Sequence, residues 1–297
     1  MIVVVHGATG AQGVPVVDRL LAAGHTVRAV TRGRRSSRPD RLPPGVHSLN
    51  VEAVNADLTD VDDLVKAYDG ADAAVLVLPG GAAPDQAVAQ ADTILTALTR
   101  ARVPRAVFNA SGAIWTRPPG VAFLDARTHL ASGLPNAVQH ATLIGPATAY
   151  MENFSEPWLV RHLHDTGNLI QTAPADASQM PVAMADIADA ATTTLTRDTP
   201  PARVVVAGPT TTTGSQIATA IARHLGRPVR WTTVSPQTYL RGVAEGLGVQ
   251  YAANIGALYG PDAQVPPPDA PPAGTLHLRG PTDLTRWIPT QNWTPTS

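Results

Sequence analysis

The first forty residues constrain this chain more than any other stretch. An apolar, β-branched run at residues 2–5 is followed at once by a turn that contains three glycines, His6-Gly7-Ala8-Thr9-Gly10-Ala11-Gln12-Gly13. An apolar stretch at residues 14–23 comes next, and a second apolar run covers residues 26–30. A strand, a glycine-rich turn, a helix and a second strand in this order predict a βαβ unit that holds a dinucleotide.

Each glycine of this turn has its own physical role. Gly7 can adopt backbone angles that a Cβ atom would forbid. Gly10 lets a pyrophosphate approach the backbone, and Gly13 lets the helix pack close to the strands. The helix N-terminus then offers free N–H groups and a positive dipole end to the phosphates. The predicted cofactor contacts in the turn are Gly7, Thr9, Gly10, Ala11, Gln12 and Gly13. The alternative is a glycine-rich turn without a ligand.

The residues after the second predicted strand indicate which dinucleotide binds. An NAD site usually has an acidic residue about 20 positions past the glycines, where it binds the ribose 2′-OH. No acidic residue occurs between Asp18 and Asp40, and Arg32, Arg34 and Arg35 stand there instead. Guanidinium groups match a phosphate in charge and in fork geometry. We therefore predict NADP(H) as the cofactor; the alternative is a solvated basic loop.

Two further strand ends are candidate parts of the cofactor site, because open α/β sheets bind ligands at the carboxyl ends of their strands. Asp57 and Leu58 follow a predicted strand at residues 51–55, and the Asp57 carboxylate or the Leu58 backbone could accept from an adenine amino group. Asp57 could instead cap the next helix, a role for which Asp60 competes. Leu78 and Pro79 end a buried strand, and their turn could line the nicotinamide ribose or be a simple loop.

Two side chains are candidates for the chemistry. Ser111 follows the predicted strand at residues 106–110, where its hydroxyl could face the nicotinamide and a substrate carbonyl, or could cap backbone groups of a turn. A helix is predicted at residues 121–132, ended by Gly133. It carries Asp125 and His129 one turn apart, so His129 could donate a proton or could make a contact on the helix surface.

Candidate substrate contacts lie beyond two strand ends. Trp115 could cover a pocket after the fifth predicted strand, and Tyr150, Met151 and Asn153 begin an aromatic-rich stretch after the sixth. Such a stretch could line a pocket for a flat apolar substrate, or it could form a second small core. We predict an α/β fold, a doubly wound parallel Rossmann sheet with a smaller C-terminal α+β substrate domain. Residues 1–150 would bind NADP and residues 151–297 the substrate, with partial interleaving.

Composition limits the possible functions. The chain has no cysteine, which excludes disulfides and thiolate chemistry, and its net charge of −1 argues against direct nucleic-acid binding. The first predicted strand begins at Met1, so we expect no signal peptide. No apolar run reaches the roughly 18 residues that span a membrane, so we expect no membrane segment. We expect a cytoplasmic monomer or homodimer without a metal. Lys66 is the only lysine, and no tyrosine is followed four residues later by lysine.

Several stretches resemble the NmrA-like family, atypical members of the short-chain dehydrogenase/reductase superfamily. They are the glycine turn at 7–13 and the segments at 27–32, 56–60, 151–154, 186–189 and 280–284. The resemblance implies a Rossmann domain, a smaller C-terminal domain and ligands between them. It also implies one of two roles, since some members are NADPH-dependent quinone, enone or ether reductases and others are redox-sensing regulators.

This chain departs from the superfamily's usual chemistry because it has no Tyr-x-x-x-Lys pair. It also has no lysine in the helix near residues 121–132, where members related to isoflavone reductases keep one. We predict an NADPH-dependent oxidoreductase that reduces a small apolar quinone, enone or carbonyl substrate mainly by positioning. The alternatives are a non-enzymatic NADP(H) redox sensor that binds a partner protein, and a redox-neutral biosynthetic enzyme on the same scaffold.

Overall fold

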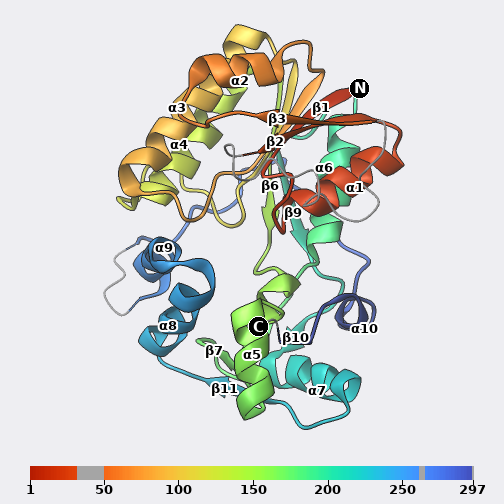
Figure 1. Cartoon of the computed structure of the whole chain (residues 1–297), viewed down its shortest axis with the longest axis vertical. Coiled ribbons are helices and arrows are strands. Elements are labelled where there is room, and N and C mark those ends of the chain that lie inside the picture. Colours follow the sequence, from red (N-terminus) through yellow and green to blue (C-terminus); the bar gives the residue numbers. More distant parts are fainter. Residues whose placement is uncertain (32–49, 261–264, 296–297) are drawn as a thin grey trace.

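The computed structural model describes residues 1–31, 50–260 and 265–295. One large sheet with helices on both sides occupies the upper half of Figure 1, and a smaller region made of later elements occupies the lower half. The predicted cofactor contacts Arg32, Arg34 and Arg35 lie outside the described residues.

The central sheet contains eight parallel strands in the order β12-β9-β6-β5-β4-β1-β2-β3. These strands are β1 (Ile2–His6), β2 (Thr26–Thr31), β3 (Val51–Asn55), β4 (Ala73–Leu76), β5 (Arg105–Asn109), β6 (His140–Pro146), β9 (Arg203–Ala207) and β12 (Leu276–Arg279). The chain builds outward from β1 in one direction and from β4 in the other, so the order reverses between these two neighbours. The predicted doubly wound parallel sheet is confirmed.

Helices cover both faces of this sheet. One face carries α1 (Gly13–Ala22) and α6 (Met184–Leu195), and the other carries α2 (Val61–Tyr68), α3 (Pro84–Ala101) and α4 (Ala122–Ala137). Successive side chains of a strand point to opposite faces. In β1, Val3 and Val5 therefore enter the core beside α1, while Val4 enters the core beside α2 and α3. A sheet buried on both faces explains why its strands read as continuous apolar runs.

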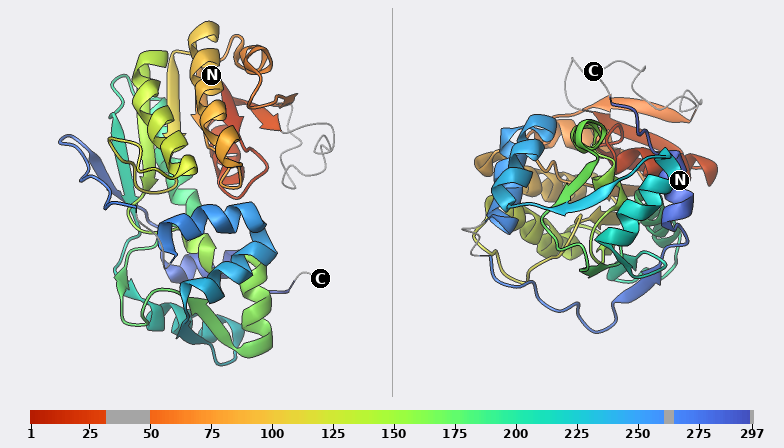
Figure 2. Two further views of the ribbon diagram at one scale, coloured as in Figure 1. Left: turned by 90° about the vertical axis from the view of Figure 1, so that its left-hand side faces the viewer. Right: turned by 90° about the horizontal axis from the view of Figure 1, so that it is seen from below.

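The smaller region lies beyond the end at which β6 leaves the sheet, as Figures 1 and 2 show. It comprises η2 (Met151–Phe154), α5 (Pro157–Thr166), β7 (Asn168–Gln171), β8 (Ser178–Gln179), β10 (Thr212–Thr213), α7 (Gly214–Leu225), β11 (Arg230–Thr233), α8 (Pro236–Leu247), α9 (Val249–Tyr259), α10 (Leu284–Trp287) and η3 (Ile288–Thr290). Two short strand pairs and a separate apolar core hold it together. Because α6, β9 and β12 return to the large sheet, the chain is interleaved between the two regions.

The predicted helix end at Gly133 is wrong. Helix α4 continues through Gly133 and ends at Ala137. A Cβ atom at position 133 would lie 2.5 Å from Leu95 Cδ1 on the neighbouring α3. The missing side chain therefore serves the close packing of two helices and does not terminate the helix.

One buried carboxylate fastens the C-terminal segment to the sheet layer. Asp186, in the first turn of α6, is 4% exposed and accepts hydrogen bonds from the Thr282 backbone N–H at 3.1 Å and from the Thr282 hydroxyl at 2.6 Å. Gly280 passes so close that an added Cβ would lie 2.1 Å from Asp186 Oδ2. The residue does not cap α6, whose N-cap is Ala183.

We expect Asp186→Ala to lower the free energy of unfolding by about 2–4 kcal/mol, because two charge-assisted bonds are lost and their donors stay unpaired. Asp189→Ala is the matched control on the same helix. Asp189 pairs with Arg19 at a half-exposed site, so its loss should cost less than about 1 kcal/mol. Urea unfolding of both variants measures the difference, and equal losses would contradict the assigned role of Asp186.

Candidate functional site

The parallel sheet brings five of the predicted site residues to a single edge. Gly7 follows β1, Asp57 follows β3, Pro79 follows β4, Ser111 follows β5 and Tyr150 follows β6. The carboxyl ends of parallel strands share one edge, and ligands of such sheets bind where the strand order reverses. In this sheet that place is the junction of β1 and β4.

The glycine turn after β1 has the conformation that its sequence predicts. Gly7 has a φ of +60°, a value that favours glycine. The Gly7 carbonyl accepts a hydrogen bond from the Gly10 N–H at 2.8 Å, which closes the turn. A Cβ at Gly13 would lie 2.1 Å from the Gly7 carbonyl oxygen, so only glycine fits there. Thr9, Gly10 and Ala11 are exposed at the tip of the turn.

The start of α1 can accept a phosphate. Its N-cap residue, Gln12, makes no side-chain cap, and the first turn contains no acidic residue. The backbone N–H groups of Ala11 and Gln12 find no acceptor among the described residues. Free N–H groups at the positive end of a helix bind anions. The turn therefore fits a pyrophosphate on the geometry of this chain.

A hydrogen-bonded cluster joins this turn to the ends of β5 and β6. Gln12 Oε1 accepts from Asn109 Nδ2 at 3.0 Å and from the Ser111 hydroxyl at 2.9 Å. Asn109 Oδ1 in turn accepts from the Ser111 N–H and from the Tyr150 hydroxyl, both at 3.0 Å. We call these four residues the amide–hydroxyl cluster. Asn109 was not among the predicted site residues, although a polar residue within the apolar run at 106–110 was a signal for it.

The backbone of Ser111 is strained. Its φ of +58° lies in the left-handed region, which costs a non-glycine residue about 1–2 kcal/mol. Strain of this kind persists where the surrounding structure imposes it, and it concentrates at functional sites. The hydroxyl bonds to the Gln12 side chain and not to a backbone group of its own turn, so the capping alternative is not what the structure shows.

Tyr150 is the buried acid of the cluster. Burial raises the pKa of its hydroxyl to about 12, against smaller lowering effects from Asn109, Ser111 and the charge of Arg127. The hydroxyl therefore keeps its proton at neutral pH and acts as a hydrogen-bonding group.

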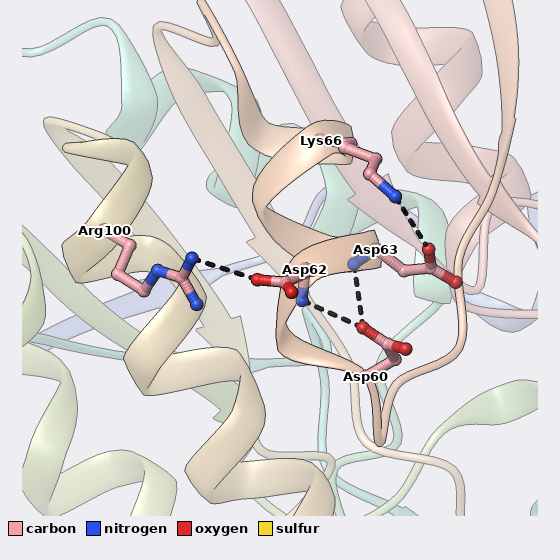
Figure 3. Close-up of polar contacts among 5 residues, drawn as sticks. All are labelled: Asp60, Asp62, Asp63, Lys66 and Arg100. Carbon is pink, nitrogen blue, oxygen red and sulfur yellow. Dashed lines mark hydrogen bonds and ion pairs between the residues drawn. The ribbon is translucent and has the colours of Figure 1, made fainter.

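Asp60, and not Asp57, caps helix α2. Asp60 is the N-cap of α2 and accepts from the backbone N–H groups of Asp62 and Asp63 at 2.9 and 3.0 Å (Figure 3). Asp57 is exposed, and hydrogen bonds from the Thr59 backbone and hydroxyl lower the pKa of its carboxyl group. The capping alternative for Asp57 is thus excluded, and its contact with adenine stays a prediction.

The single lysine lies outside the amide–hydroxyl cluster. Lys66 projects from α2, is 75% exposed and pairs with Asp63 at 3.5 Å, while Arg100 pairs with Asp62 beside it (Figure 3). These are surface ion pairs, which contribute little to stability. Lys66 forms no pair with Tyr150 of the kind that superfamily members use.

Helix α9 holds the loop after β4. Asn254 Nδ2 donates to the Gly80 carbonyl at 2.8 Å and to the Ala82 carbonyl at 3.2 Å. The Tyr251 ring lies against Gly80, where a Cβ would come within 2.5 Å of it.

The side chains of Leu58 and Leu78 are buried in the core beside α2 and α3, so only their backbones could face a cofactor.

The proline-rich segment after residue 265 holds the loop after β5. The Trp115 indole N–H donates to the Pro266 carbonyl at 2.9 Å, and its buried ring packs with Phe123 and Leu124. The Asp269 carboxylate accepts from the backbone and hydroxyl of Thr116. These contacts give Trp115 a packing role, and its predicted substrate contact stays a prediction.

His129 and Asp125 do not meet. His129 Nε2 lies 2.5 Å from Asp92 Oδ1 on the neighbouring α3, and Asp125 Oδ1 accepts from the Gly120 N–H at 2.9 Å. The alternative of a His129–Asp125 surface contact is therefore wrong. The structure does not bring His129 to Ser111.

The stretch after β6 divides between core and surface. Met151, Phe154 and Trp158 lie in the core of the smaller region, whereas Asn153 is exposed. The Glu152 carboxylate accepts from the Met184 N–H at the start of α6 and from the indole of Trp287. Most of this aromatic stretch is therefore a second core, which was one of the two alternatives. Tyr150 is the member that reaches the amide–hydroxyl cluster.

The described residues contain no group of three or more side chains that could hold a metal ion. Within the same residues, no helix combines the length and apolar character that crossing a membrane requires.

Comparison with known proteins finds a family and a fold. The family model described as NmrA-like matches residues 1–261. A nucleoside-diphosphate-sugar epimerase from Staphylococcus aureus superposes with a TM-score of 0.71 at 17% identity, over 97% of this chain and 99% of its own. An NADPH-dependent quinone oxidoreductase from Escherichia coli, complexed with NADPH, superposes with a TM-score of 0.64 at 21% identity. The match covers 88% of this chain and 92% of the oxidoreductase.

The negative transcriptional regulator NmrA, in complex with NADP, gives a TM-score of 0.64 at 19% identity, over 89% of this chain and 83% of its own. A search of curated proteins finds no match. At such identities these likenesses show the fold.

We expect Tyr150→Phe to make the protein less sensitive to alkaline pH. The hydroxyl ionises near pH 10 in the unfolded chain and near pH 12 in the native protein. The stability linked to its proton is therefore complete below pH 10 and is lost as pH rises towards 12. Between pH 9 and pH 11 the wild type should lose about 1.4 kcal/mol more free energy of unfolding than the variant. Urea unfolding at both pH values measures this, and equal losses would contradict the raised pKa.

Proposed function

Because the chain belongs to the NmrA-like family, we propose that it is an NADP(H)-dependent oxidoreductase that reduces an apolar quinone, enone or carbonyl compound. The observation that carries this proposal is the amide–hydroxyl cluster. It connects the glycine turn to two hydroxyl groups, those of Ser111 and Tyr150, at the edge of the sheet where ligands bind.

The residues of the edge fit the dinucleotide. The turn from Gly7 to Gly13, with the free N–H groups of Ala11 and Gln12 just before α1, would hold the pyrophosphate. Asp57 and the backbone at Leu58 would contact the adenine, and the backbone at Leu78 and Pro79 the nicotinamide ribose. Arg32, Arg34 and Arg35 would bind the 2′-phosphate and so select NADP(H) over NAD(H). When bound, this cofactor supplies a hydride.

The chain's contribution to the chemistry would be to orient the acceptor. The Ser111 O–H can rotate, so it can turn from Gln12 towards the oxygen of a bound substrate. Tyr150 keeps its proton and adds a second polar group beside it. A quinone needs little acid assistance, so correct placement supplies most of the rate. Residues 151–297, apart from the elements that return to the sheet, would provide most of the substrate-binding surface.

A second candidate is a non-enzymatic NADP(H) sensor that signals to a partner protein. It is favoured by the state of Tyr150, which holds its proton tightly and has no lysine beside it, since Lys66 pairs with Asp63. A redox-neutral enzyme is a third candidate on the same scaffold, because fold alone does not fix function.

The direct test is NADPH consumption by the purified protein with a panel of quinones, enones and aldehydes, with NADH in parallel. The proposal expects turnover that is selective for NADPH and fastest with a flat apolar acceptor. Binding of NADPH by titration without turnover of any acceptor would contradict the reductase and favour the sensor.

We expect Ser111→Gly and Tyr150→Phe each to lower kcat/KM for the acceptor about tenfold or more, while the Kd for NADPH stays within about threefold. Glycine tolerates the φ of position 111, so this change removes the hydroxyl without adding strain. Lys66→Gln is the matched control and should leave both constants unchanged. An unchanged kcat/KM in both hydroxyl variants would refute the orienting role.

His129→Gln tests whether His129 donates a proton. Its contact with Asp92 on α3 leads us to expect a kcat within about twofold of wild type, well short of the 10²-fold or larger effect of losing a general acid. A loss of that larger size, measured with the preferred acceptor, would restore His129 as a proton donor.

A further inference from the structure

Asn109 is an unusual residue for its position. It ends β5, a central strand with apolar neighbours on both sides along the chain, and it is 6% exposed. A buried amide must satisfy its polar atoms or destabilise the fold. Asn109 does so with three bonds, to Gln12, Ser111 and Tyr150, and each of these residues belongs to a different element or loop.

The direction of these bonds follows from what each atom can do. The Tyr150 hydroxyl and the Ser111 N–H both donate to Asn109 Oδ1, and Asn109 Nδ2 donates to Gln12 Oε1. The Ser111 hydroxyl donates to the same Gln12 oxygen. Gln12 Oε1 therefore has two donors, while the Ser111 hydroxyl has a proton that can be redirected.

This arrangement allows the Ser111 hydroxyl to break its hydrogen bond to Gln12 while Gln12 Oε1 keeps a donor, Asn109 Nδ2. When the Ser111 O–H turns to a substrate oxygen, Asn109 still satisfies Gln12 Oε1 and so holds the glycine turn in place. The bond from the Ser111 N–H to Asn109 Oδ1 meanwhile keeps the backbone at φ +58°. The Asn109 amide thus holds both Gln12, at the end of the glycine turn, and Ser111, whose hydroxyl would face the substrate.

We propose that Asn109 is a positioning residue for the reduction. It holds Gln12 and the strained backbone of Ser111 in place, so that the Ser111 hydroxyl is free to bind the acceptor's oxygen. The inference rests on the proposed function. It differs from a purely structural role, in which Asn109 would affect stability and leave the turnover of the folded protein unchanged.

Two substitutions separate the roles. Asn109→Leu removes all three bonds and keeps the branched shape of the side chain at Cγ. Asn109→Asp keeps an oxygen for Tyr150 and Ser111, but an ionised carboxylate would turn a second oxygen towards the Gln12 acceptor. A protonated carboxyl could donate to Gln12 again. The activity of Asn109→Asp should therefore depend on pH in a way that neither the wild type nor Asn109→Leu shows.

The experiment measures kcat, acceptor KM and NADPH Kd for the full chain with the fastest acceptor of the panel, below the melting temperature of each variant. We expect Asn109→Leu to lower kcat about tenfold or more at every pH, with NADPH Kd within about threefold. Asn109→Asp should show a similar loss at pH 8 and recover at least half of it at pH 5.5.

Gln12→Met removes the acceptor of the Asn109–Gln12 hydrogen bond. Because Gln12 lies on the partly exposed turn, this variant provides a second measurement if the Asn109 variants do not fold. Gln12→Met should lower kcat. The double variant with Asn109→Asp should lose no more kcat than the more affected of the two single variants. A wild-type kcat in the folded Asn109 variants, or fully additive losses in the double variant, would overturn the positioning role. Absence of turnover in the wild type would instead refute the proposed function itself, and the inference with it.

Discussion

All eight strands of the central sheet run parallel, and the position of every candidate contact follows from this constraint. Each helix returns the chain to the far edge, so the loops after β1, β4, β5 and β6 meet at one side (Figure 1). There the backbone leaves the hydrogen bonds of the sheet and its polar groups need other partners. At the β1 turn, Gly13 packs on the Gly7 carbonyl, and the N–H groups of Ala11 and Gln12 find no acceptor among the described residues.

The smaller region completes this edge. Asn254 of α9 binds the loop after β4, and the Pro266 carbonyl binds Trp115 in the loop after β5. The loops that would contact a cofactor are thus held by residues far along the chain, from α9 and from the segment after residue 265. The fold itself is shared with an epimerase, a quinone reductase and a transcriptional regulator. Because a fold alone does not fix a function, the proposed function rests on the side chains of the amide–hydroxyl cluster.

The sequence predicts those features that depend on local pattern. The glycine turn, the parallel strands and the place of Ser111 follow from residues that are neighbours along the chain. The contacts that were not predicted join residues far apart in the chain: Asn109 donates to Gln12, which lies 97 positions earlier. His129 shares a helix face with Asp125, but its partner Asp92 comes from another helix. Local spacing shows which face a side chain occupies, and only the packed structure shows what lies opposite.

We propose that the dinucleotide binds on the glycine turn with its nicotinamide beside the Ser111 and Tyr150 hydroxyls. A crystal structure of the protein with NADPH would show where each part of the cofactor lies. We expect the pyrophosphate on the N–H groups of Ala11 and Gln12, just before α1, and the nicotinamide ring in contact with Ser111. A dinucleotide whose nicotinamide lies away from Ser111, or whose phosphates bind elsewhere than the turn, would contradict it.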